Sequence, residues 1–197
     1  MKANKKVSTL IAASMLISST SVIGAETINR ELIGKDRIET AVKISKDGWS
    51  STETVVLVND FAIADALTAT PLAYAKNAPI LLTSKKSLSY RTKEEIKRLK
   101  AKNIILIGGK SVLPKSVEDE LIKLGLKVDR IEGNTREETA LAIAKRLDGI
   151  KDISEIAVVN GTTGLADAVS ISAVAAERNM PILLQILNLV YQYQKNL

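Results

Sequence analysis

The chain has 197 residues, of which 46% are hydrophobic and 25% charged, and its formal net charge is +6. This length and apolar content suit one or two globular domains and argue against wholesale disorder. The sequence has neither cysteine nor histidine, so disulfides, thiolate chemistry, Ser-His-Asp triads and histidine-ligated metal sites cannot be built from it.

The first 25 residues have the pattern of a secretory signal peptide. Three lysines precede a short apolar run over residues 10–17, and small residues follow as far as Ala25. The run is too short to span a membrane as a mature helix, and no capping residue marks it as a buried amphipathic helix. We therefore predict secretion, with cleavage after Gly24 or Ala25 that lowers the formal net charge to +3.

A duplicated segment opens the first predicted helix. Residues 34–41 (GKDRIETA) return as residues 133–140 (GNTREETA), and five of the eight positions are identical. In each copy a capping residue, Asp36 or Thr135, is followed three places later by Glu, which is the pattern of a capping box. The same helix start is therefore predicted twice.

The duplication extends beyond these helix starts. Val58-Asn59 recurs as Val159-Asn160, Ala64-Asp65-Ala66 as Ala166-Asp167-Ala168, and Pro79-Ile80-Leu81-Leu82 as Pro181-Ile182-Leu183-Leu184. The offset grows from 99 to 102 residues, with the last residue gained in a predicted turn, as a duplicated fold tolerates. We divide the chain into a signal peptide (1–25), a first copy (26–132), a partial second copy (133–184) and a divergent tail (185–197).

Strands and helices alternate along both copies. Strands are predicted at 53–58, 79–83, 104–107, 127–131, 156–159 and 180–184, and helices at 37–48, 64–75, 92–100, 114–124, 136–147 and 166–177. Thr92 with Glu95 is the predicted cap of the third helix, and Pro114 opens the fourth. Strands without polar alternation are typical of parallel sheets buried on both faces. The pattern predicts an α/β fold with a parallel sheet and right-handed crossovers.

The second copy departs from the first after its fourth predicted element. Residues 185–197 are apolar and aromatic and match nothing in the corresponding part of the first copy. Our hypothesis is a frameshift, a truncation or a gene fragment. Half a unit would leave apolar sheet faces uncovered, so we expect marginal solubility alone or assembly with a partner.

The run Gly108-Gly109-Lys110-Ser111 suggests a phosphate-binding loop, but that motif needs a glycine where Ile104 stands. We therefore predict a tight strand-to-helix turn in which glycine supplies a positive φ. Binding of an anion to exposed amides near the helix start stays open. The chain also lacks a Gly-x-Gly-x-x-Gly fingerprint, so a nucleotide-dependent enzyme is not indicated.

Four charged residues are repeated at helix starts. Arg37 and Arg136 oppose the helix dipole there, which indicates either structural pairing, with Glu39 or a neighbouring unit's carboxylate, or binding of an anion. Asp65 and Asp167 favour the dipole, and no second carboxylate accompanies them at a repeated spacing. A two-carboxylate hydrolase is therefore not indicated. Aromatic residues are only 3% of the chain, so a stacking platform for sugars is not expected.

Taken in order, these motifs resemble the type 2 cell-wall-binding repeat (CWB2) family of secreted Gram-positive proteins. The resemblance covers about residues 32–184 and rests on Gly-x-x-Arg-x-Glu-Thr-Ala, Ala-Asp-Ala, Pro-Ile-Leu-Leu and Ile-Ile-Leu-Ile-Gly-Gly. It implies Rossmann-like repeats, three of which assemble with pseudo-threefold symmetry in family members. It also implies non-catalytic anchoring to anionic wall polymers such as teichoic-acid-like glycans.

The resemblance assigns polymer-binding residues in both copies. They are Arg37, Asp65, Pro79, Ile80, Leu81, Leu82, Arg136, Asp167, Pro181, Ile182, Leu183 and Leu184. The second copy departs from the family by having Thr135 in place of the usual Asp and Glu137 in place of an aromatic or aliphatic residue. Self-assembly or further repeats would complete a threefold arrangement. No catalytic residue, metal, cofactor, nucleic-acid partner or stable membrane span is expected.

Two other functions remain open at this stage. The chain could be a fragment of a wall enzyme, such as an N-acetylmuramoyl-L-alanine amidase, whose catalytic domain is absent from it. It could also be a secreted Rossmann-like domain that binds a small ligand, which the missing glycine fingerprint disfavours.

Overall fold

The computed structural model describes residues 32–161 and 163–185. The predicted signal peptide and most of the predicted divergent tail lie outside these residues. Within the described part, no helix is both long and apolar enough to cross a membrane.

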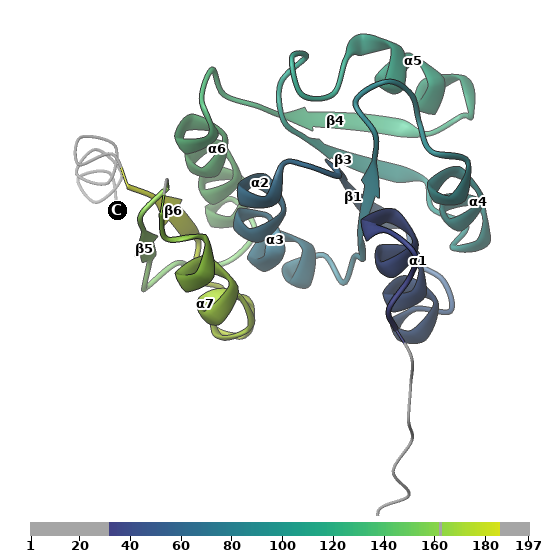
Figure 1. The fold of residues 1–197 in the computed structure, drawn as a ribbon. Helices are drawn as coiled ribbons and strands as arrows, with labels where there is room; N and C mark the ends of the chain where they lie inside the picture. Colours follow the sequence, from purple (N-terminus) through teal and green to yellow (C-terminus); the bar gives the residue numbers. More distant parts are fainter. Residues whose placement is uncertain (1–31, 162, 186–197) are drawn as a thin grey trace, which may run out of the picture. The chain divides into compact units, whose positions relative to one another are not determined.

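The first copy forms a four-stranded parallel sheet with helices between its strands (Figure 1). Its elements are α1 (Arg37–Gly48), β1 (Thr54–Asn59), α2 (Ile63–Thr68), α3 (Thr70–Ala75), β2 (Ile80–Thr83), α4 (Tyr90–Arg98), β3 (Asn103–Ile107), α5 (Lys115–Lys123) and β4 (Lys127–Ile131). The strand order is β2-β1-β3-β4, so the chain moves to one side of β1 and then returns to the other. The predicted α/β fold with a parallel sheet is confirmed.

The second copy repeats the first five elements of the first, with one helix in place of α2 and α3. It consists of α6 (Arg136–Asp148), β5 (Ala157–Val159), α7 (Leu165–Glu177) and β6 (Ile182–Leu184), and β5 pairs with β6 in parallel. These elements match α1, β1, α2 with α3, and β2, in that order.

Helices cover both faces of the four-stranded sheet. Val55 and Leu57 of β1 lie in a core with residues of α1, α4 and α5. Val56 and Val58 lie in a second core, on the other face, with residues of α2, α3 and α6. Alternate residues of one strand thus enter two cores, which explains why β1 is apolar without a polar alternation.

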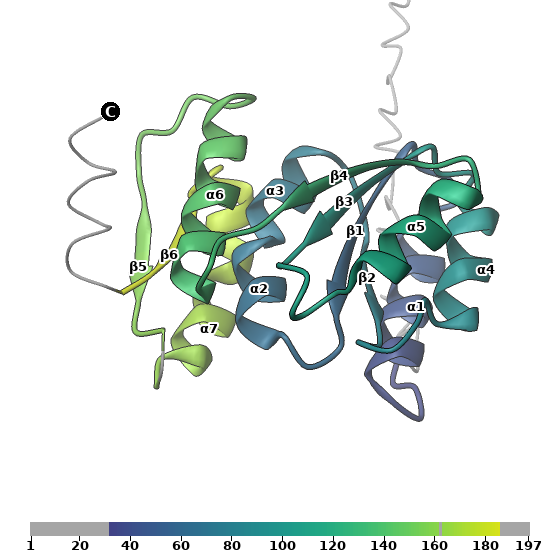
Figure 2. The same cartoon turned by 90° about the horizontal axis from the view of Figure 1, so that it is seen from above.

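Helix α6 belongs to the cores of both copies, and both views show it between the two sheets (Figures 1 and 2). Its Ile143 packs with the first copy's sheet. Ala140 lies in the core of the second copy, and Ala144 packs with Leu183 of β6. The first helix of the second copy therefore completes the fold of the first.

Two expectations about helices were wrong. The single helix predicted over residues 64–75 is divided into α2 and α3 at Ala69, because Pro71 at the start of α3 has no N–H to continue the first helix. The second copy has Ala173 at the equivalent position, and α7 is continuous.

The cap predicted for α4 was also wrong, since the helix begins at Tyr90 and Thr92 lies inside it. The Thr92 hydroxyl donates instead to the Leu82 carbonyl, at 2.5 Å. Glu95 is only 2% exposed and accepts hydrogen bonds from Ser45 Oγ at 2.6 Å and Arg98 Nε at 2.8 Å. Both side chains fasten α4 to its neighbours, so neither is available for capping.

Candidate functional site

The duplicated segment builds the same helix entrance in each copy. In the second copy, the Gly133 amide donates to Thr139 Oγ1 at 3.1 Å, and that hydroxyl donates to the Thr135 carbonyl at 3.0 Å. Thr135 Oγ1 accepts from the Glu138 amide, and the Glu138 carboxylate accepts from the Asn134 amide at 2.7 Å. The equivalent residues of the first copy make all four bonds as well.

The glycine of this segment is required by a close backbone approach. A Cβ at Gly133 would lie 2.4 Å from Glu138 Cβ and 2.6 Å from the Thr139 nitrogen. A Cβ at Gly34 would meet the equivalent atoms of Glu39 and Thr40 at 2.6 Å. Five identical positions in the two copies thus include a glycine and a threonine that hold the chain against the first helical turn.

The repeated arginines reach the loop that follows the first strand of their own copy. Arg136 donates to the Gly161 carbonyl at 3.1 Å, and Arg37 donates to the equivalent Asp60 carbonyl at 3.5 Å. The Arg37 guanidinium also lies 4.7 Å from the centre of the Phe61 ring. The structure therefore places Arg37 on this loop and not in an ion pair with Glu39, which was one of the predicted partners.

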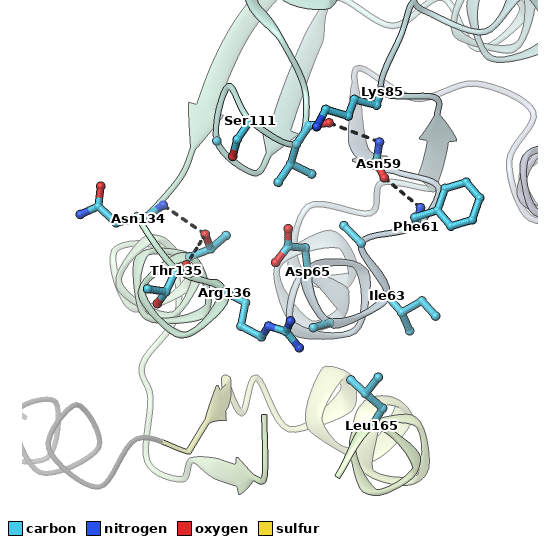
Figure 3. Close-up of a pocket in the computed structure, with 16 residues that line it drawn as sticks. Asn59, Phe61, Ile63, Asp65, Lys85, Ser111, Asn134, Thr135, Arg136 and Leu165 are labelled. Atoms are coloured by element: carbon cyan, nitrogen blue, oxygen red, sulfur yellow. Dashed lines mark hydrogen bonds between the residues drawn. The ribbon is translucent and has the colours of Figure 1, made fainter. Parts of the chain in front are cut away.

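A pocket of about 480 Å³ lies where the two copies meet, and we call it the inter-repeat pocket (Figure 3). It is lined by the end of β1 and the residues that follow it, by Lys85 after β2, and by loop residues after β3 and β4. The lining residues are Asn59, Phe61, Ala62, Ile63, Ala64, Asp65, Lys85, Gly109, Ser111, Val112, Gly133, Asn134, Thr135, Arg136, Thr139 and Leu165. These loops all follow the carboxyl ends of parallel strands. The strand order changes direction between β1 and β3, which is the place where open α/β sheets bind ligands.

Asp65 is the buried charged group of this pocket. It is 6% exposed, and its carboxylate faces the pocket opposite Arg136 of α6 (Figure 3). Burial raises the pKa of Asp65 from 3.8 to about 6, and the positive charge of Arg136 opposes that rise. No hydrogen bond from the described residues reaches the carboxylate to stabilise its charged form.

Gly108 provides the space that Asp65 occupies. Its φ of +107° disfavours any residue with a side chain, and a Cβ there would lie 3.3 Å from Asp65 Oδ2. The prediction that glycine supplies a positive φ after β3 is therefore confirmed at Gly108.

A second hollow of about 590 Å³ adjoins the inter-repeat pocket, and we call it the adjoining hollow. The two share four lining residues, Gly109, Ser111, Gly133 and Asn134. The adjoining hollow adds the cations Lys110 and Lys145 and the carboxylates Glu132 and Glu138. Because these residues line both hollows, the two lie side by side at the same end of the strands.

The other predicted site residues lie elsewhere. Arg37, Pro79, Ile80 and Leu82 line an apolar hollow of about 430 Å³, while the Leu81 side chain is fully buried in the core. The strand signature of the second copy, residues 181–184, is buried as well. Asp167 is exposed in the first turn of α7. The structure thus brings Asp65 and Arg136 into one pocket, and Arg37 with Pro79, Ile80 and Leu82 into another.

Sequence reasoning missed several residues of the inter-repeat pocket. Lys85, Ser111 and Asn134 each follow a different strand and have no shared motif. The available signal was the rule that loops after parallel strands meet at one edge of the sheet. Among residues 32–161 and 163–185, no group of three or more acidic side chains is placed to hold a metal ion.

The family model described as Cell wall binding domain 2 (CWB2) matches the chain over residues 31–118 and 130–193. Among curated proteins, the chain is 34% identical over 183 residues to the N-acetylmuramoyl-L-alanine amidase LytC of Bacillus subtilis (strain 168). This alignment covers 93% of the chain and 36% of LytC. An amidase enhancer of the same organism is 37% identical over 151 residues, which are 77% of this chain and 21% of the enhancer.

Two solved structures share the fold. Cwp6 from Clostridium difficile matches with a TM-score of 0.79 and 38% identity over 84% of this chain and 27% of that one. Cwp8 from the same organism matches with a TM-score of 0.70 and 43% identity, over 77% of this chain and 26% of that one. The chain therefore spans little more than a third of the length of LytC, and less of the other three proteins.

Proposed function

The chain belongs to the cell wall binding domain 2 family, and from this membership we propose that it anchors non-catalytically to the cell wall through an anionic wall polymer. The observation that carries the proposal is the pair of connected hollows at the strand ends. Four cations line them, Lys85 and Arg136 in the inter-repeat pocket and Lys110 and Lys145 in the adjoining hollow.

The chemistry of this surface suits a polymer of phosphate-linked units. The start of α6 forms part of both hollows, and the first amides of a helix attract anions. One carboxylate of the adjoining hollow, that of Glu138, already accepts a hydrogen bond from the Asn134 amide. Cations on flexible side chains hold each phosphate weakly, so affinity would come from several units bound at once.

We further propose that the protein acts at the cell surface after secretion. The predicted signal peptide supports export, and the relatives named as a cell-wall amidase and an amidase enhancer support a role at the wall. The polymer-binding roles of Arg37, Asp167 and the two Pro-Ile-Leu-Leu strands remain part of the proposal.

Comparison of the two copies supports binding of an additional repeat. Ile143 of α6 is 2% exposed because it packs on the first copy's sheet, whereas the equivalent Ile44 of α1 is 46% exposed. Asp65 is buried opposite Arg136, whereas the equivalent Asp167 is exposed. We propose that a further repeat, from this chain or another copy of it, covers α1 and α7 as the second copy covers the first.

Charge reversal tests the polymer-binding proposal. The full chain and a Lys85→Glu/Lys110→Glu variant would be incubated with isolated Gram-positive cell walls over a salt series, and the bound fraction measured. Since each lost cation removes attraction to phosphate and adds repulsion, we expect at least about tenfold weaker binding and a shallower salt dependence, by analogy with nucleic-acid binding.

Lys127→Glu is the control, because Lys127 is exposed and begins β4, at the end of the strand opposite to the one that leads into the hollows. It should bind walls as the unmodified chain does. Equal binding by the double variant would contradict the proposed groove. Release of soluble wall fragments during the incubation would instead favour the alternative that the chain is part of a wall-degrading enzyme.

A further inference from the structure

We infer that Asp65 couples the binding of an anionic group in the inter-repeat pocket to the uptake of one proton, so that the pocket holds its anion more tightly at acid pH. This inference deepens the proposed function, on which it rests, by assigning a regulation to the same site. It concerns Asp65, which lines the same pocket as Lys85 and Arg136, and not those two cations themselves.

The geometry places a negative group where an anion would have to bind. Asp65 is more than nine-tenths buried, lines the pocket, and has no hydrogen-bond donor among the described residues to stabilise its charge. The carboxylate lies beside Gly108, where an added Cβ would come within 3.3 Å of Asp65 Oδ2. An anion held by Arg136 therefore has this carboxyl as a neighbour.

The charged groups around Asp65 come from several elements. Arg136 of α6 is the charge that acts on its pKa, and Lys85 lines the same pocket from the loop after β2. Lys110 after β3 and Glu132 after β4 lie in the adjoining hollow. Helix α7 contributes the apolar Leu165 to the pocket. Asp60 lies in the loop between β1 and α2.

Proton linkage fixes the sign of the effect. In the free pocket the Asp65 pKa is about 6, so the carboxyl is mostly ionised at pH 8 and mostly protonated at pH 5. An incoming phosphodiester disfavours the ionised form further and raises this pKa. A carboxyl that is protonated in the complex and ionised in the free protein must take a proton from solvent, so affinity falls as pH rises above about 6.

The experiment titrates the full chain with glycerophosphoglycerol, a phosphodiester whose own charge does not change between pH 5 and pH 8. For each unit by which the anion raises the pKa, affinity changes tenfold, so we expect binding about tenfold weaker at pH 8 than at pH 5. Calorimetry at pH 7 in two buffers of different ionisation enthalpy should show net proton uptake by the protein.

Two variants separate the inference from its background. Asp65→Asn keeps the shape without the titrating group, so its affinity should be independent of pH and at pH 8 should exceed that of the unmodified chain. Asp152→Asn makes the same change at an exposed position that lines neither hollow, and it should keep the normal pH profile. Carbon NMR of the Asp65 carboxyl provides an independent measurement, and its pKa should rise when the phosphodiester is added.

The outcomes distinguish failure of the proton coupling from failure of the proposed polymer binding. A chain that binds walls and the phosphodiester with a flat pH profile, or an Asp65 pKa that the ligand does not change, overturns the inference and leaves the proposed function standing. A chain that binds neither at any pH overturns both. A normal profile in the Asp65→Asn variant assigns the coupling to another group and also overturns the inference.

Discussion

Replacing Asp65 by asparagine should stabilise the folded chain at pH 8 and have little effect at pH 4. Burial raises the pKa of this carboxyl from 3.8 to about 6 in the folded state. The folded state therefore binds the proton more tightly than the unfolded state does, so stability is lost as pH rises from about 4 to about 6, and the full loss persists at higher pH. A rise of this size corresponds to about 3 kcal/mol at pH 8 and to less than about 1 kcal/mol at pH 4.

Urea denaturation followed by circular dichroism, at intervals from pH 4 to pH 8, measures this difference. The free energy of unfolding of the variant minus that of the unmodified chain should grow between pH 4 and about 6 and stay level above that pH. The control Asp167→Asn should stay within about 0.5 kcal/mol of the unmodified chain throughout, because that side chain is exposed. A difference that is independent of pH, or a variant less stable at pH 8, would refute the reasoning.

Two further substitutions test the packing that supports the site. Gly133→Ala forces a Cβ against the first turn of α6 and should lower the free energy of unfolding, measured by urea denaturation, by about 1–3 kcal/mol. Gly48 has open space around it, so the control Gly48→Ala should not destabilise the chain. Equal effects of the two substitutions would contradict the close approach at Gly133. Glu95→Ala removes the carboxylate that accepts hydrogen bonds from Ser45 and Arg98, and it should lower the free energy of unfolding by about 2–4 kcal/mol. A loss below about 0.5 kcal/mol would show that this buried network is not important for stability.

Local structure was predictable wherever one short segment determines it. The capping pattern at Asp36 and Thr135 predicted where α1 and α6 begin, and both caps are present. Pro114 and the glycine after β3 likewise act through their own backbone. The break at Pro71 was missed because the small residues of that helix suggested a continuous one, although proline lacks the N–H that continuity needs.

The partnership between the two copies could not be predicted. The apolar spacing of α6 shows which face is buried, but Ile143 packs on the first copy's sheet and Ala140 in the second copy's core. Asp65 and Arg136 were each proposed as binding residues by family resemblance, yet only the folded chain places them in one pocket. Lys85 was missed because its contribution depends on where β2 ends in space. That the second copy is truncated remains a prediction.

Binding to walls with and without their anionic polymers tests the central claim most directly. The full chain would be mixed with intact isolated walls and with walls from which anionic polymers have been removed chemically, and the bound protein measured at low salt. The account predicts binding to intact walls, its loss after polymer removal, and competition by the extracted polymer. Binding that is unchanged by polymer removal would contradict it.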